Sequence, residues 1–177
     1  MNKIAVVYYS KHGTTRMYAE KLAEAVGADL FDAHETKYAD VKDYDVIVYG
    51  GGIYSGGIKG IEFLKKGWRK GLSEKKIITF AVGITIDQEE NRQQCREINF
   101  VKKLEGLPCY FLPGAYDPAT LTGVDKKIMG FTLKLIGGGK AQGATVESGA
   151  IIDRMKNGCD LRDLSALEPL IEAVRAL

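Results

Sequence analysis

The sequence predicts an α/β fold with a doubly wound, five-stranded parallel sheet. Short apolar runs alternate with segments of helical periodicity, which is the pattern of strands that helices cover on both faces. Turns rich in glycine and hydroxyl side chains follow several of these runs. Five such strands fit the order 2-1-3-4-5, in which ligands bind beyond the carboxyl ends of the strands, where the strand order reverses.

Each element follows from a local pattern. Tyr18, Leu22 and Val26 are spaced for one face of a first helix. The closing helix is expected to begin near Ser165, with Glu168 at the spacing of a capping box. The expected strands are Ile4–Tyr9, 28–33, 45–49, 76–82 and 107–112, and the expected helices are 17–26, 58–66, 89–104 and 170–176.

The composition is that of a globular protein. The 177 residues suit one domain over 1–177, with a helical insert after the fifth strand at about 115–147 and an extension at about 148–177. A net charge of +2 without a dense basic run gives no indication of nucleic-acid binding. Three scattered cysteines and two histidines offer no metal site. The chain enters a strand at once, without a signal peptide, so we expect a cytoplasmic protein.

The turn after the first strand has the features of an anion site. It reads SKHGTT from Ser10 to Thr15 and leads into the first helix. Free N–H groups and the positive end of the helix dipole face such a turn, and its hydroxyls add neutral donors. The simpler alternative is that Thr14 only caps the helix. The chain has neither a P-loop motif nor a dinucleotide-binding motif here, so a phosphate bound in this turn most simply belongs to a cofactor.

The turn after the third strand is rich in glycine. It reads GGGIYSGG from Gly50 to Gly57, and its five glycines let the backbone approach a ligand closely and adopt positive φ. They flank Ile53 and Tyr54, a flat apolar pair suited to cover an aromatic ring. The alternative is a flexible glycine loop with no ligand.

A third turn, from Gly83 to Asp87, follows the fourth strand. Gly83 lets the backbone reach a ligand and Thr85 offers a hydroxyl, but Thr85 or Asp87 could equally cap the next helix. In the expected strand order all three turns meet at one edge of the sheet. We call them turn one (10–15), turn two (50–57) and turn three (83–87).

These turns resemble those of a known family. Turn one resembles the flavodoxin phosphate loop T/S-x-T-G-x-T, with His12 in place of a Thr. The run GGGIY of turn two resembles the loop that packs on one face of the flavin, with Gly52 where Ser is common. The segment from Gly114 to Gly139 is similar to that of the bacterial quinone-dependent protoporphyrinogen IX dehydrogenases.

The resemblance implies FMN, with its phosphate on turn one and its isoalloxazine between turns two and three. It implies an FMN-dependent oxidoreductase that takes hydrogen from a small-molecule substrate and passes electrons to a quinone, or else a flavodoxin-type electron carrier. Carriers of this family are strongly acidic, so a net charge of +2 favours the enzyme. No catalytic residue is assigned. The implied cofactor-binding residues are Ser10, His12, Gly13, Thr14, Thr15, Gly51, Gly52, Ile53, Tyr54, Gly83, Ile84 and Thr85.

The segment from Val124 to Ile136 (residues 124–136) predicts a helix with two apolar faces. Phe131 lies on one face and Met129 and Leu133 on the other, with lysines between them. A helix on a soluble domain needs only one apolar face. The second face favours the inner membrane surface, a second copy of the chain, or a flat apolar substrate with carboxylates. The alternative is that the extension buries both faces.

Overall fold

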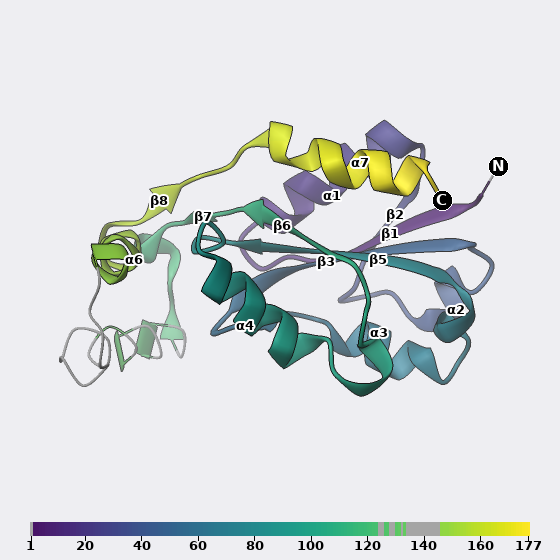
Figure 1. Ribbon diagram of the computed structural model, residues 1–177, viewed down its shortest axis with the longest axis horizontal. Helices are drawn as coiled ribbons and strands as arrows, with labels where there is room; N and C mark the ends of the chain where they lie inside the picture. The colour runs from purple at the N-terminus through teal and green to yellow at the C-terminus, as the bar shows by residue number, and fades with distance from the viewer. Residues whose placement is uncertain (1, 124–125, 128–129, 132, 134–145) are drawn as a thin grey trace.

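The computed structural model describes residues 2–123, 126–127, 130–131, 133 and 146–177. Its central sheet has five parallel strands in the order β2-β1-β3-β5-β6, and the short β4 pairs antiparallel with β3 (Figure 1). The predicted order 2-1-3-4-5 is therefore confirmed, with β5 and β6 as the fourth and fifth parallel strands. The strands of this sheet are β1 (Ile4–Tyr9), β2 (Asp29–Asp32), β3 (Val46–Tyr54), β4 (Gly57–Ile58), β5 (Lys76–Gly83) and β6 (Cys109–Pro113).

Helices cover both faces of the sheet. In Figure 1, α1 and α7 lie above it and α3 and α4 below it. Each layer has its own apolar core, because the buried strand residues point alternately to the two faces. The helices are α1 (Thr14–Val26), α2 (Tyr38–Val41), α3 (Glu62–Trp68), α4 (Glu89–Asn99), α6 (Val146–Asn157) and α7 (Glu168–Arg175), with 3-10 turns η1 (Leu72–Glu74), η2 (Lys102–Leu104), η3 (Pro118–Thr120) and η4 (Leu164–Leu167).

The glycine run of turn two is strand, which corrects the prediction of a loop. Gly50, Gly51 and Gly52 pair with β5 on one side, and the first two also pair with β1 on the other. None of them has positive φ; within turn two only Ser55 and Gly56 do, at 49° and 79°. The glycines are needed for space, because a Cβ atom on Gly50 would lie 1.9 Å from the Phe80 ring. The expected helix 58–66 accordingly starts later, as α3.

Two helix starts also differ from the prediction. Gly13, at φ 91°, is the N-cap of α1 and makes no side-chain cap bond, so Thr14 belongs to the helix and does not cap it. Near the C-terminus the Asp163 carboxylate accepts from the Ser165 N–H at 2.8 Å and caps η4. The capping box expected between Ser165 and Glu168 is therefore wrong: the nearer carboxylate captures the N–H.

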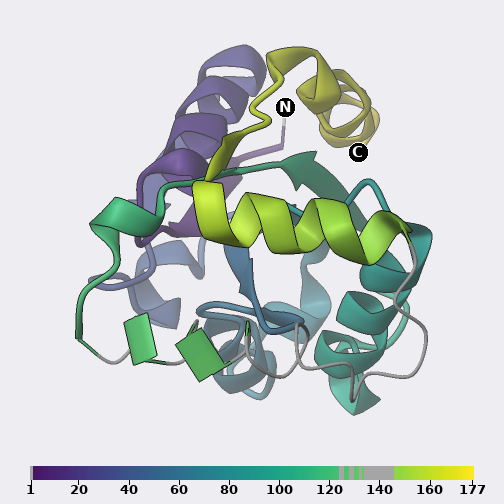
Figure 2. The same ribbon diagram turned by 90° about the vertical axis from the view of Figure 1, so that its left-hand side faces the viewer.

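The segment 148–163, which the sequence left unassigned, contains most of α6 and the strand β8 (Cys159–Asp160). β8 pairs antiparallel with β7 (Ala115–Tyr116), which follows β6 directly. Figure 2 shows α6 crossing the molecule in front of the sheet, on the side where the parallel strands end. The C-terminal segment thus lies at the edge where the three turns were expected.

Only part of the predicted amphipathic helix at 124–136 is described. Lys126, Lys127, Gly130, Phe131 and Leu133 have helical backbone, and Phe131 is 64% exposed. The remaining residues, including Val124, Met129 and Ile136, lie outside the described residues. The two apolar faces predicted for this helix therefore stay a prediction. No helix in the described part of the chain is long and apolar enough to cross a membrane.

Candidate functional site

Turn one leads into the N-terminus of α1, where the first N–H groups have no carbonyl of the same helix to bond. The first bond of the helix runs from the Met17 N–H to the Gly13 carbonyl at 2.9 Å, so the N–H groups of Thr14 to Arg16 precede it. The Ser10 hydroxyl accepts from the Gly13 N–H at 3.1 Å and closes the turn. The positive φ of Gly13 lets the chain turn sharply into the helix. This is the geometry in which helix termini bind phosphate.

Thr15 connects turn one to turn two. Its side chain is buried, with the residue 4% exposed. A Cβ atom on Gly52 would lie 3.6 Å from Thr15 Oγ1 and 3.1 Å from the Tyr54 ring. A glycine at position 52 therefore leaves open the space between the Thr15 hydroxyl and the Tyr54 ring, where any larger residue would intrude.

Ile53 and Tyr54 do not form one flat pair, which corrects the sequence interpretation. They are successive residues of β3, so their side chains point to opposite faces. Ile53 reaches turn three, where its Cδ1 atom lies 3.0 Å from the position of a Cβ on Gly83. Tyr54 faces turn one, with its ring centroid 6.3 Å from that of His12 and 5.4 Å from Lys59 Nζ. Turn two therefore contacts both of the other turns.

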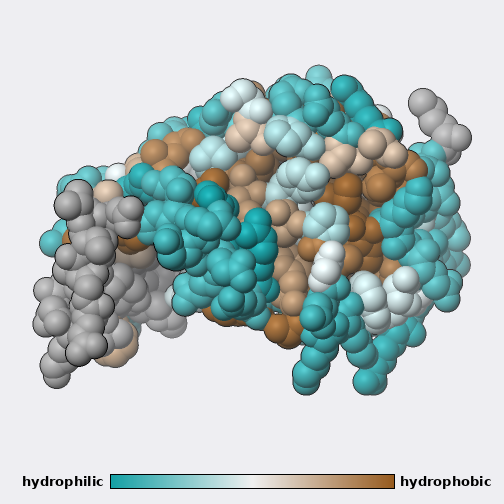
Figure 3. All heavy atoms as spheres, viewed as in Figure 1, coloured by the Kyte–Doolittle hydropathy of each residue, from teal (hydrophilic) through white to brown (hydrophobic). Residues whose placement is uncertain are grey.

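A buried asparagine that the sequence analysis missed holds the far end of turn two. Asn99 is 3% exposed and lies at the end of α4. Its amide oxygen accepts from the Ile58 N–H at 2.8 Å, and its amide nitrogen donates to the Gly56 carbonyl at 2.8 Å. Polar residues cover the outer side of α4 (Figure 3), so Asn99 is unusual in pointing inward. Asn99 lies inside the helix expected at 89–104, and the sequence gives no local signal that its side chain points inward.

Turn three is held through its carbonyl groups. The Gly83 carbonyl accepts from the Gly114 N–H at 2.9 Å, and the Ile84 carbonyl accepts from Arg154 Nη1 at 2.6 Å. The Thr85 carbonyl accepts from the Asn91 side chain at 3.2 Å. The Ile86 carbonyl accepts from Arg92. Four consecutive carbonyls of this turn are thus bonded to donors outside it. Thr85 does not cap α4, whose N-cap is Gln88.

The ribbon β7–β8 forms a wall beside turn one. A cavity of about 260 Å³ lies between them. Tyr116 is one of its lining residues; the Tyr116 hydroxyl itself is buried and has no hydrogen-bond partner among the described residues, and burial raises its pKa. Of the residues that line this cavity, His12 and Thr14 were predicted from the sequence, and the residues of β7 and β8 were not. The cavity is lined by His12, Thr14, Ala115, Tyr116, Asp117, Thr120, Cys159, Asp160 and Arg162.

The geometry therefore brings all three predicted turns to one edge of the sheet, as a doubly wound fold requires. Residues 5–142 match the family model described as flavodoxin domain. The chain belongs to the flavodoxin-domain family. The match ends before α6, so the helix and β8 lie outside the part of the chain that the family model covers.

Solved structures with the same fold are distant in sequence. The WrbA-like flavodoxin of Agrobacterium tumefaciens is 18% identical, with a TM-score of 0.50 over 64% of this chain and 84% of that one. A flavoprotein of Lactobacillus acidophilus, solved in complex with FMN, is 16% identical, with a TM-score of 0.42 over 64% and 93%. Oxidised flavodoxin 2 of Bacillus cereus is 18% identical, with a TM-score of 0.45 over 63% and 85%. No curated protein gave a match.

The residues of this flavodoxin domain fit a flavin mononucleotide. Turn one offers helix N–H groups and hydroxyls for a phosphate, and Gly52 leaves open the space beside Thr15. The buried Tyr116 hydroxyl is a further polar group without a partner in the described part of the chain. Ile53 supplies an apolar contact for a flat ring, and the hydrogen-bonded backbone of turn three supplies an edge beside it.

Proposed function

We propose that the chain binds FMN across turns one, two and three and acts as an oxidoreductase. The observation that supports this most directly is the convergence of the α1 N-terminus with a glycine strand at the carboxyl edge of the sheet. The phosphate would bind at turn one, through Ser10 and the N–H groups and hydroxyls of Thr14 and Thr15, with Gly13 forming the turn. His12 would lie at its outer side. When bound, the isoalloxazine supplies the electron transfer chemistry.

The flavin ring would lie between turns two and three. Gly52 carries no side chain that would block it, and Gly51 would contact it through backbone atoms only. Ile53 would contact it from the side of Gly83, and the backbone of Ile84 and Thr85 would line its other edge. Tyr54 would cover the end nearest the phosphate, because its ring already lies toward His12. This assignment differs from the sequence interpretation only in separating Ile53 from Tyr54.

The reaction we propose is dehydrogenation of a small apolar substrate, of the protoporphyrinogen type, with a quinone as electron acceptor. The near-neutral charge of the chain supports an enzyme over a carrier, because carriers use acidic surfaces to reach their partners. The exposed Phe131, near Lys126 and Lys127 in sequence, supports contact of the segment 124–136 with an anionic apolar partner or an inner membrane surface. A second copy of the chain is an alternative partner for this segment.

Thr14→Ala combined with Thr15→Ala tests the phosphate site. The double variant should weaken the binding of FMN by about 2–5 kcal/mol, because two charge-assisted hydrogen bonds are lost. Riboflavin, which has no phosphate, should lose little affinity in the same variant. Both affinities can be measured by quenching of flavin fluorescence. Ser73→Ala, in η1 before the opposite end of β5, is the control that should change neither.

The outcomes separate the functions. If the double variant binds FMN as tightly as the wild type, turn one does not hold the phosphate. If the wild-type protein binds FMN and turns over protoporphyrinogen with a menaquinone analogue, the dehydrogenase assignment is supported. If it shows no such turnover but passes electrons from a reductase to an acceptor protein, it is a flavodoxin-type carrier.

A further inference from the structure

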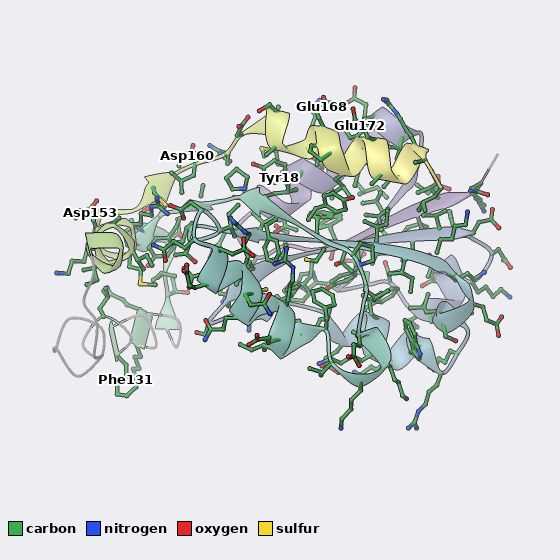
Figure 4. The ribbon with its side chains drawn as sticks, viewed as in Figure 1. Tyr18, Phe131, Asp153, Asp160, Glu168 and Glu172 are labelled. Carbon is green, nitrogen blue, oxygen red and sulfur yellow. The ribbon has the colours of Figure 1, made fainter. Side chains whose placement is uncertain are left out.

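Among the described side chains of α6, Arg154 is the one that hydrogen-bonds to turn three. Arg154 donates through Nη1 to the Ile84 carbonyl at 2.6 Å and to Asp87 Oδ1 at 2.9 Å, and through Nη2 to Asp87 Oδ2 at 2.8 Å. Its side chain is 20% exposed. Asp153, the preceding residue on α6, bonds to no described residue except Asn157 of the same helix, and Figure 4 shows it on the outer side of the molecule. The arginine is therefore the residue of this pair that contacts the sheet edge.

The contacts of Arg154 with Asp87 and with Ile84 differ in kind. The bidentate pair with Asp87 fixes the guanidinium in one orientation, because a planar fork and a carboxylate match at two points. The bond to the Ile84 carbonyl then fixes one peptide of turn three. The pKa of Asp87 is lowered, chiefly by the hydrogen bonds from Arg154, so the carboxylate stays charged under ordinary conditions.

The peptide between Ile84 and Thr85 determines which backbone group of turn three faces away from α6. A trans peptide directs its C=O and its N–H in opposite directions, and the described chain has no cis peptide. With the Ile84 carbonyl directed to α6, the Thr85 N–H is directed away from it. The neighbouring carbonyls of Gly83 and Thr85 are held by Gly114 and Asn91. Arg154 thus completes a set of outside donors that leaves turn three one backbone orientation.

We propose that Arg154 is a positioning residue for the flavin ring: from outside the site it fixes turn three so that the backbone N–H groups of this turn face the isoalloxazine. The inference deepens the proposed function and rests on it. It assigns to α6, which lies beyond the family match, a part in the cofactor site. Arg154 acts on the ring end of the site, far along the chain from the phosphate turn.

This position predicts a selectivity opposite to that of the turn-one variant. Arg154→Gln should weaken the binding of FMN and of riboflavin by the same factor, roughly two- to fivefold for a partly exposed ion pair. The phosphate contributes equally before and after the change, so the ratio of the two affinities should stay constant. Arg154→Lys keeps the positive charge on a single donor nitrogen but lacks the planar guanidinium that binds Asp87 at two points. It should recover part of the lost affinity. Asp87→Asn should resemble Arg154→Gln.

The control is Lys156→Gln, which removes one positive charge from an exposed position of the same helix. It should leave both affinities unchanged. Hydrogen exchange of residues 83–87 and 146–157 in each variant shows whether turn three itself loosens. Faster exchange in both segments together with the equal loss of affinity supports the inference.

Two failures are distinguishable. If the wild-type chain binds neither flavin, the proposed function fails and the inference fails with it. If the wild type binds FMN but Arg154→Gln and Asp87→Asn keep wild-type affinity for both flavins, only the inference fails, and Arg154 serves to attach α6. A loss confined to FMN would also overturn it, since Arg154 would then act on the phosphate.

Discussion

Turns two and three flank the same space but are held in different ways. Turn two is held from within by Asn99, a neutral side chain that is 3% exposed and donates and accepts in the core. Turn three is held from outside by Arg154, which pairs with a carboxylate whose side chain is 53% exposed. The first attachment is buried and independent of pH and salt. The second is charged and lies at the surface.

This difference indicates which of the two turns can change its position. A buried amide that satisfies two backbone groups cannot move without leaving them unpaired, which costs the full desolvation of each. A surface ion pair contributes less and can exchange with water and salt. We therefore expect turn two to be the rigid wall of the site and turn three the wall whose position depends on conditions and on α6.

The largest effect should follow from breaking the buried attachment. Asn99→Ala leaves the Ile58 N–H and the Gly56 carbonyl without their partner, and the free energy of unfolding should fall by about 2–6 kcal/mol, at about 1–3 kcal/mol for each unpaired group. Chemical denaturation followed by the fluorescence of Trp68 measures this change. Asn157→Ala, which removes an exposed amide bonded only to Asp153, should stay within about 0.5 kcal/mol. Equal losses in the two variants would show that Asn99 holds nothing.

A smaller effect should follow from adding a side chain at Gly51, where neighbouring atoms already occupy the space. A Cβ atom on Gly51 would lie 2.4 Å from the Lys59 carbonyl oxygen and 2.7 Å from Ile58 Cγ2. Because the nearer atom is backbone, the β3–β4 hairpin must shift, and Gly51→Ala should destabilise the protein by about 1–3 kcal/mol. Thermal unfolding measures the loss. Gly106→Ala, where nothing lies within 4 Å of the added Cβ but φ is 78°, is the control for backbone strain without a clash.

Turn one and the sheet order could be predicted because their signals are local. In turn one, a strand, a glycine between hydroxyl residues and a helix follow one another directly along the chain. A parallel sheet then brings turns one, two and three together. The extent of β3 was missed because glycine usually weakens strands. Here the glycines admit the Phe80 ring and the Lys59 backbone, and neither contact is visible from the neighbouring residues.

The attachments of turns two and three could not be predicted for a different reason. Asn99 bonds to Ile58 across 41 residues, and Arg154 bonds to Ile84 across 70. Both lie in helices whose sequence shows only polar residues on an outer face, and nothing local separates an inward Asn or Arg from an exposed one. Tyr116 could not be singled out from the sequence, because its burial depends on pairing with β8, which the sequence left unassigned.

The smallest effect is the response of turn three to salt and pH, and it tests the comparison most directly. The pKa of Asp87 is lowered in the folded protein, so the stabilisation by its pair with Arg154 is fully present above the ordinary carboxyl pKa of about 3.9 and is lost as the pH falls through the lower folded value. The rate of hydrogen exchange of residues 146–157, corrected for the intrinsic rate, should therefore stay constant between pH 8 and 5 and should increase below about pH 3.9.

Raising the ionic strength from 0.05 to 1 M at pH 7 should increase this rate by a factor of about five or less, since a partly exposed pair contributes up to about 1 kcal/mol. Asp87→Asn should abolish both responses, whereas exchange of the Ile58 amide, bonded to Asn99, should show neither in the wild type. If the Ile58 amide responds to salt as strongly as α6 does, the two turns are not held in different ways.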